Sequence, residues 1–205
     1  MKLFLFILLL LPPFLAAQPF ELSDTGTAAP DFRAQFLASY GVNPAIEPEV
    51  TQEDRPLYER IAPFLRENPR QAIRIVESEI GPDSNPAFHF LLGNLYYQTG
   101  QYRQSERALQ RAVSQFPSFR RAYRTLGLIY IQSDRFEEAI EAWLKVITLG
   151  GGDAQSYGLL AYAYLTQEKY SSSLSAYQKA RMFKPESTDF RRGAAQCLLQ
   201  TDQLK

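Results

Sequence analysis

The sequence predicts an all-α protein in which one pair of antiparallel helices is repeated along the chain. The first observation is a motif that recurs every 34 residues without insertion, as Leu92-Gly93-x-x-Tyr96, Leu126-Gly127-x-x-Tyr130 and Leu160-Ala161-x-x-Tyr164. The second is that further columns keep the same phase: Tyr102, Phe136 and Tyr170, then Ser105, Ala139 and Ser173, then Ala112, Val146 and Ala180. The third is a composition of 45% hydrophobic and 13% aromatic residues, which is enough for a packed core. A fixed period of this length is typical of a helical solenoid.

Residues 1–17 have the pattern of a secretory signal peptide. Lys2 is followed by an apolar run from Leu3 to Leu11 and by the small pair Ala16-Ala17. The run is too short for a membrane-spanning helix. We expect cleavage after Ala17, with Ala16 as the alternative, and an exported protein, periplasmic or secreted, that keeps no integral membrane segment.

Residues 18–50 are expected to form a flexible leader followed by a docking arm. The leader is rich in Pro, Thr, Ser, Asp and Gly. A short helix is predicted from Asp31 to Gly41, and the prolines between Val42 and Val50 favour an extended chain. This arm docks either on the helical array or on another protein.

Residues 51–84 are predicted to form a degenerate helix pair. Thr51-x-x-Asp54 opens a helix that carries Leu57, Ile61, Phe64 and Leu65, and Asn68-Pro69 starts a second helix that Gly81-Pro82 ends. Three regular units follow at 86–119, 120–153 and 154–187. A capping helix and tail at 188–205 are expected to cover the open end of the array.

This pattern resembles the tetratricopeptide repeat (TPR) family over about two thirds of the chain. The resemblance implies a solenoid of helix-turn-helix units wound as a right-handed superhelix. It also implies that small residues let paired helices approach closely, so that Gly93, Gly127 and Ala161 face Ser105, Ala139 and Ser173. Function in this family is protein binding in a concave groove.

No pattern in the sequence predicts catalysis. His89 is the only histidine, which disfavours Ser-His-Asp and Cys-His mechanisms and rules out a histidine-based metal cluster. Its place in the repeat indicates packing. Phosphate-loop, dinucleotide and calcium-loop motifs are absent from the sequence, so we expect no catalytic, cofactor-binding or metal-binding residues. Cys197, the only cysteine, has the context of a small buried residue.

Charge favours a protein or peptide partner over nucleic acid. The 22 basic residues balance the 22 acidic ones, which leaves no global field to attract a polyanion. By family geometry, the first helix of each unit and the terminal helix line the groove. The residues that fall on this lining are Phe90, Asn94, Tyr97, Arg121, Arg124, Leu128, Ile131, Tyr162, Leu165, Arg192, Gln196 and Leu199. Their apolar character, with arginines at one rim, suits a peptide with apolar anchors and carboxylates; alternatively, Leu128, Ile131 and Leu165 pack between units or under the arm.

A narrower resemblance is to tetratricopeptide proteins that accompany TonB/ExbB energy-transduction components. The segments that carry it are Phe36-Leu37-x-x-Tyr40-Gly41-Val42, Arg60-Ile61-Ala62-Pro63, Phe90-Leu91-Leu92-Gly93-Asn94-Leu95-Tyr96, Phe116-Pro117-Ser118-Phe119-x-Arg121-Ala122 and Leu149-Gly150-Gly151-x-Asp153-x-x-x-Tyr157-Gly158-Leu159-Leu160. This similarity implies association with a membrane complex through a partner protein. Alternatives are a cell-envelope scaffold for peptidoglycan, division or secretion machinery, and an accessory subunit that positions a substrate for a separate enzyme.

Overall fold

The computed structural model describes residues 45–201, and all regular structure within that range is helical. The helices are α2 (Arg55–Ile61), α3 (Phe64–Glu67), α4 (Pro69–Glu79), α5 (Pro86–Gln98), α6 (Tyr102–Gln115), α7 (Arg120–Gln132), α8 (Phe136–Thr148), α9 (Ala154–Thr166), α10 (Tyr170–Phe183) and α11 (Thr188–Gln200). The expected signal peptide, leader and short helix after Asp31 lie outside the described residues. The all-helical prediction is confirmed for the range that the structure describes.

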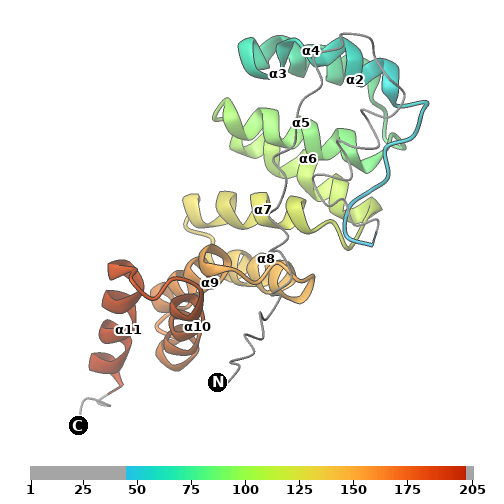
Figure 1. Ribbon diagram of the computed structural model, residues 1–205. Coiled ribbons are helices and arrows are strands. Elements are labelled where there is room, and N and C mark those ends of the chain that lie inside the picture. Colours follow the sequence, from blue (N-terminus) through green and yellow to red (C-terminus); the bar gives the residue numbers. More distant parts are fainter. Residues whose placement is uncertain (1–44, 202–205) are drawn as a thin grey trace, which may run out of the picture. The chain divides into compact units, whose positions relative to one another are not determined.

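The helices pack in chain order as a solenoid of pairs (Figure 1). Each of α5/α6, α7/α8 and α9/α10 forms an intimate pair, and α11 packs on α10 and α9. The first helices of the pairs begin at Pro86, Arg120 and Ala154, so the 34-residue spacing of the sequence is also the spacing of the helix starts.

Small residues bring the paired helices together, as the repeat columns predict. The Ser105 hydroxyl donates a hydrogen bond to the Gly93 carbonyl at 2.6 Å, and the Ser173 hydroxyl donates one to the Ala161 carbonyl at 2.8 Å. Both serines are fully buried. The middle unit has Ala139 at this column, and there the ring of Trp143 covers Gly127.

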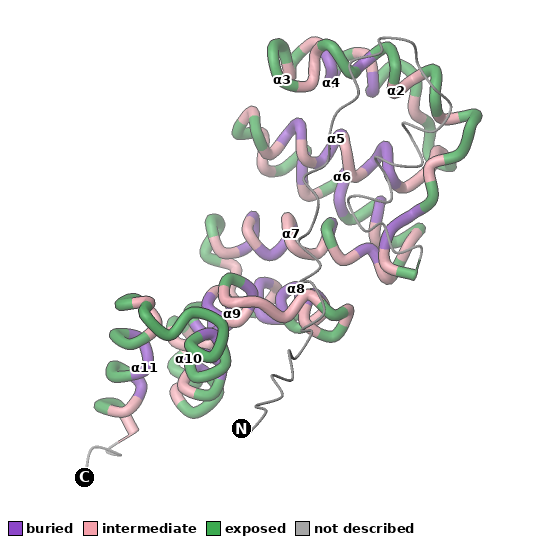
Figure 2. The backbone as a smooth tube through the Cα atoms, viewed as in Figure 1, coloured by how far each residue is buried: buried purple, intermediate pink, exposed green. Residues whose placement is uncertain are grey.

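The core runs between the helices (Figure 2). One cluster of buried residues extends from α6 to α11 around Trp143, and a second joins α2 and α4 to α5 and α6 through Ile61, Val76 and Leu95. Cys197 is fully buried, as its sequence context predicts, and its thiol lies 3.2 Å from the Ser173 hydroxyl.

The degenerate first unit differs from the prediction in one respect. Its first helix is divided into α2 and α3, with a turn at Ala62 and Pro63. Proline has no amide hydrogen to donate to the carbonyl four residues earlier, so the hydrogen-bond ladder is interrupted although Ala62 and Pro63 keep helical backbone angles. Our expectation of one helix through Leu57, Ile61, Phe64 and Leu65 was therefore wrong.

Candidate functional site

The candidate binding face is formed by the first helix of each regular pair, with α11 after them. Local capping fixes where two of these helices begin. The Asn85 side chain accepts a hydrogen bond from the amide of Ala87 at 2.9 Å at the start of α5. Asp153 and Ser156 form a reciprocal capping box at the start of α9.

At the α5 and α7 end of this face, an arginine stands over an aromatic pair. The rings of Phe90 and Phe119 lie 4.7 Å apart between centroids, and Phe119 is fully buried. The Arg121 guanidinium lies 5.0 Å from the centre of the Phe90 ring, within cation–π range. The predicted groove residues Phe90 and Arg121 therefore do come together.

The described end of the predicted arm, residues 45–50, lies against the N-terminal ends of these two helices. Residues 45–47 form a turn and a bend, so the expectation of an extended chain was wrong there, and residues 48–50 have no regular structure. Three backbone carbonyls of this segment accept hydrogen bonds from the array: Ala45 from the Ser118 hydroxyl at 2.6 Å, Ile46 from the Arg120 amide at 3.3 Å and Glu49 from the Asn85 side chain at 2.8 Å. This part of the arm docks on the array, which was one of the two alternatives that the sequence left open.

One side-chain ion pair fixes the middle of this segment. The Glu47 carboxylate accepts a hydrogen bond from Arg121 Nε at 2.7 Å, and Glu47 is only 5% exposed. Burial raises the pKa of Glu47 above its ordinary value of 4.5, although the attraction and hydrogen bond of Arg121, and the charge of Arg120, act to lower the pKa. The desolvation cost of the ionised carboxylate therefore exceeds the stabilisation that it gains from Arg121 and Arg120.

In the middle of the face, the predicted residues are engaged within the array. The Thr125 hydroxyl donates to the Asn94 side-chain oxygen at 3.1 Å. Arg124 pairs with Asp153 at 2.9 Å and also donates to the Gln155 side chain. These bonds join α5 to α7 and α7 to the start of α9.

The predicted apolar residues of the middle are half-buried. Leu128, Ile131 and Leu165 pack against the main core, as does Tyr97, whose ring centroid lies 5.7 Å from that of Tyr102. Packing between units accounts for these contacts, which was the alternative for Leu128, Ile131 and Leu165.

The α9 and α11 end of the face is more open. Tyr162 is 42% exposed, and its ring meets the edge of Phe136 at 6.0 Å between centroids. Arg192 and Gln196 are exposed, and Leu199 is 62% exposed. Exposed aromatic and aliphatic side chains, with a guanidinium and an amide on α11, are residue types that suit a partner segment.

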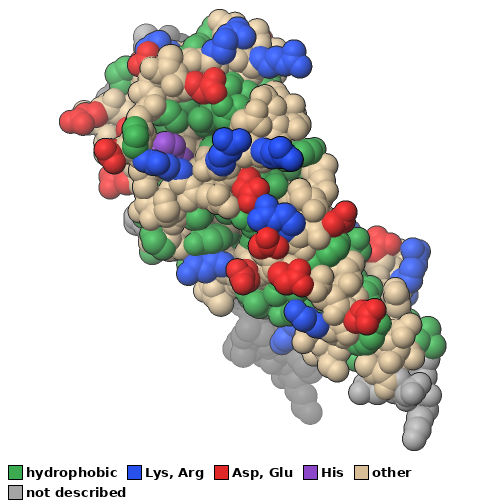
Figure 3. Space-filling view, turned by 180° about the vertical axis from the view of Figure 1, so that it is seen from behind, with side chains coloured by type: hydrophobic (Ala, Val, Ile, Leu, Met, Phe, Trp, Pro, Cys, Tyr) green, Lys and Arg blue, Asp and Glu red, His purple; other side chains and the backbone are tan. Residues whose placement is uncertain are grey.

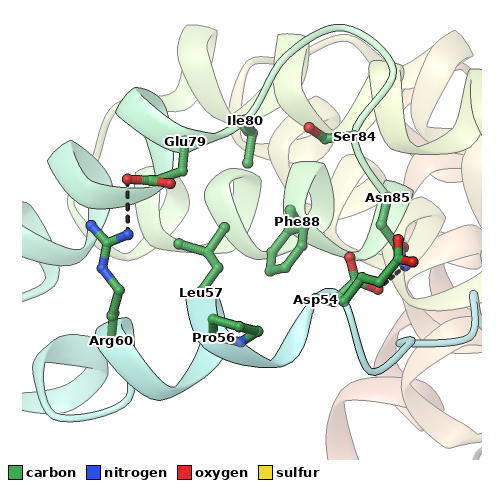
Figure 4. Close-up of a pocket in the computed structure, with 10 residues that line it drawn as sticks. Asp54, Pro56, Leu57, Arg60, Glu79, Ile80, Ser84, Asn85 and Phe88 are labelled. Carbon is green, nitrogen blue, oxygen red and sulfur yellow. Dashed lines mark hydrogen bonds and ion pairs between the residues drawn. The ribbon is translucent and has the colours of Figure 1, made fainter.

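Sequence reasoning missed a pocket of about 290 Å³ in the degenerate unit (Figure 4). Leu57 and Phe88 form its apolar floor, while Arg60 pairs with Glu79 at 2.9 Å on one side. On the other side Asn85 donates to Asp54 at 2.8 Å. The residues that line the pocket come from α2, α4 and α5 and the segments beside them. No local sequence pattern predicts that these three helices come together.

The described residues do not group the ligands of a metal ion, and one face of the molecule (Figure 3) carries charges of both signs. Acidic and basic side chains alternate over the face shown in Figure 3. Within residues 45–201, no three His, Cys, Asp or Glu side chains are grouped so that they could hold a metal ion. In the same range, no helix combines the length and apolar character needed to cross a bilayer.

His89 packs inside the first regular unit, as its repeat position predicts. It is 7% exposed, and its Nε2 atom has no hydrogen-bond partner. Burial, together with the nearby positive charge of Arg111, lowers the pKa of His89, although a hydrogen bond with the Pro82 backbone opposes the shift. The imidazole is therefore neutral at pH 7.

Comparison with known proteins supports the interpretation of the repeats. Two tetratricopeptide repeat models match the chain, one over residues 90–155 and one over residues 154–186. No curated protein matches the sequence.

Solved MamA structures share the fold. A MamA fragment from Desulfovibrio magneticus RS-1 aligns with a TM-score of 0.66 at 18% identity, over 75% of this chain and 88% of that one. MamA of MSR-1 gives 0.63 at 20% identity, over 72% and 87%, and a further MamA crystal structure gives 0.66 at 20% identity, over 72% and 82%. At this level of identity the likeness concerns the fold alone.

Proposed function

Because the chain is a tetratricopeptide repeat protein, a scaffold for protein interaction, we propose that it binds an extended partner segment across α5, α7, α9 and α11. In this proposal the chain performs no reaction of its own. Affinity comes from a rigid surface whose side chains are already held in place before the partner arrives.

The observation that carries the proposal is the docked segment 45–50. Its backbone carbonyls meet donors on Ser118, Arg120 and Asn85, and its carboxylate meets Arg121. The N-terminal ends of α5 and α7 therefore already bind a polypeptide segment, and the α9 and α11 end offers the exposed side chains of Tyr162 and Leu199 to another.

We also propose the cellular compartment in which the chain acts and the class of its partner. The signal-like residues 1–17 support export, with the mature chain acting in the periplasm of a Gram-negative cell. The similarity to tetratricopeptide proteins that accompany TonB/ExbB components supports a partner in an inner-membrane complex that energises outer-membrane transport.

Site-specific crosslinking tests the face and the partner together. A photoreactive amino acid would replace Tyr162 in the full chain expressed in a Gram-negative host, and adducts would be identified by mass spectrometry. Met182 is the matched control position, because it is 73% exposed but lies on α10, a second helix. We expect one dominant adduct from position 162, to a TonB/ExbB-type component, and none from position 182.

The other outcomes distinguish the proposed binding face from the proposed identity of the partner. An adduct from position 162 to a wall synthase, division protein or secretion component would keep the binding face and replace the partner. An adduct to a single enzyme whose activity depends on this chain would make the chain an accessory subunit. Equal labelling from positions 162 and 182, or labelling from neither, would contradict the proposed face.

A further inference from the structure

The segment 45–50 is held mainly through its backbone, and this limits what its sequence contributes. Carbonyl groups of Ala45, Ile46 and Glu49 receive the three hydrogen bonds from the array. Every residue has such a carbonyl, so these contacts select a backbone conformation and not a sequence. Sequence selectivity is left to the ion pair of Glu47 with Arg121 and to Pro48, which is buried beside it.

The receiving groups are held in place by the array itself. The Asn85 side-chain oxygen caps α5, and its amide nitrogen donates to Asp54 as well as to Glu49. Arg121 rests on the Phe90 ring, which in turn packs on the buried Phe119. The contacts with α5, Asp54 and Phe90 do not involve the segment.

The two partners of the ion pair differ in their exposure. The Glu47 side chain is 6% exposed, whereas the Arg121 side chain is 57% exposed. The cation keeps much of its hydration in the docked state, while the carboxylate loses nearly all of its own. Because desolvation raises the pKa of Glu47 despite the neighbouring arginines, the ion pair contributes little net stabilisation to docking of the ionised segment.

We propose that Asn85 and Arg121 form a binding site for an acidic-proline peptide of a partner protein, and that residues 46–49 are an exchangeable internal copy of that ligand. The proposal rests on the proposed function, and it specifies the chemistry of the partner at the α5 and α7 end of the face. A carboxylate one residue before a proline would take the places of Glu47 and Pro48, and main-chain carbonyls on either side would take the hydrogen bonds.

A labelled peptide tests this exchange in the full chain. The probe is a fluorescein-labelled peptide of residues 45–50, Ala-Ile-Glu-Pro-Glu-Val, with blocked ends, and binding is followed by fluorescence polarisation. The unaltered chain should bind the probe weakly, because a tethered competitor acts at an effective concentration of about millimolar. Glu47→Lys gives the internal segment a positive charge that Arg121 repels, so the tethered competitor leaves the site. The probe should then bind at least about tenfold more tightly.

Glu49→Lys is the matched control, because Glu49 is exposed and contributes only its carbonyl. This variant should bind the probe as the unaltered chain does. Arg121→Glu alone should lose the probe and should bind instead a peptide carrying Glu47→Lys, because the internal Glu47 is then repelled from the site. Circular dichroism melting verifies that each variant is folded.

Three results would overturn the inference. If the probe binds no folded variant, the segment is a permanent part of the array. If the probe binds but ignores the charge exchange at Arg121, the site does not select a carboxylate. If Glu47→Lys instead produces concentration-dependent association in sedimentation experiments, the site belongs to a second copy of the chain. None of these results removes crosslinking from Tyr162, so the proposed function can stand when this inference fails.

Discussion

Replacement of Gly127 by alanine tests the close approach of α7 and α8. A Cβ atom at this position would lie 2.8 Å from both Cε2 and Nε1 of Trp143. The ring cannot swing into solvent, because Trp143 is fully buried. Overpacking of a core typically costs about 1–3 kcal/mol. The alanine also gains about 1 kcal/mol of helix propensity over glycine. We therefore expect Gly127→Ala to lower the free energy of unfolding by about 0–2 kcal/mol.

The decisive measurement is a double-mutant cycle with Trp143→Ala. Removal of the ring leaves space for the new methyl group, so only the propensity gain remains. In that background Gly127→Ala should raise the free energy of unfolding by about 1 kcal/mol, which corresponds to a coupling of about 1–3 kcal/mol between the two positions.

Urea denaturation followed by circular dichroism at 222 nm measures each corner of the cycle, because the only tryptophan of the chain is lost in half of the variants. Gly81→Ala serves as the control, since a Cβ atom there meets nothing within 4 Å. An equal effect of Gly127→Ala in both backgrounds would refute the steric argument.

Three further predictions concern titratable and reactive groups. His89 has a lowered pKa, so the stabilisation by its neutral form is complete above pH 6.5, its ordinary pKa, and is lost as the pH falls below that value. His89→Phe should therefore flatten a plot of unfolding free energy against pH below 6.5. An unchanged slope would contradict this pKa shift. Glu47 has a raised pKa, so acidification from neutral pH towards 4.5 should tighten the docked segment. The protection factor of the Arg120 amide, which donates to Ile46, should then rise, and a lower protection factor would show the opposite sign. Cys197 should resist a maleimide reagent until urea unfolds the chain, and modification of the native protein at the rate of a free thiol would contradict its burial.

The helical framework could be predicted from sequence because its causes are local and repeated. A glycine or alanine in one helix and a small residue in the next set each close approach, and the serine hydroxyls at two such contacts bond the facing carbonyls. The break between α2 and α3 could also have been foreseen, since Pro63 stands in the sequence inside the expected helix. The apolar spacing of Leu57, Ile61 and Phe64 favours one continuous helix, whereas the missing amide hydrogen of Pro63 favours a break.

The docking of residues 45–50 was beyond the reach of sequence patterns. Its hydrogen bonds use backbone carbonyls, which carry no residue signature, and the donor Asn85 is already explained by its role as a helix cap. Glu47 looks like any charged residue in a proline-rich stretch. Only the folded arrangement places its carboxylate beside Arg121 at a separation of 74 residues.

Repeat phase identifies which face of a helix lines the array, but it does not say whether a neighbouring unit already uses that face. Asn94 with Thr125 and Arg124 with Asp153 join successive units from positions that the phase assigned to the groove. Removing such residues would disturb the array as well as any ligand, so loss of binding in those variants would not identify a binding residue. Tyr162 is more exposed than these residues, and among the described residues its ring contacts that of Phe136. Its replacement therefore gives the cleanest separation of binding from folding.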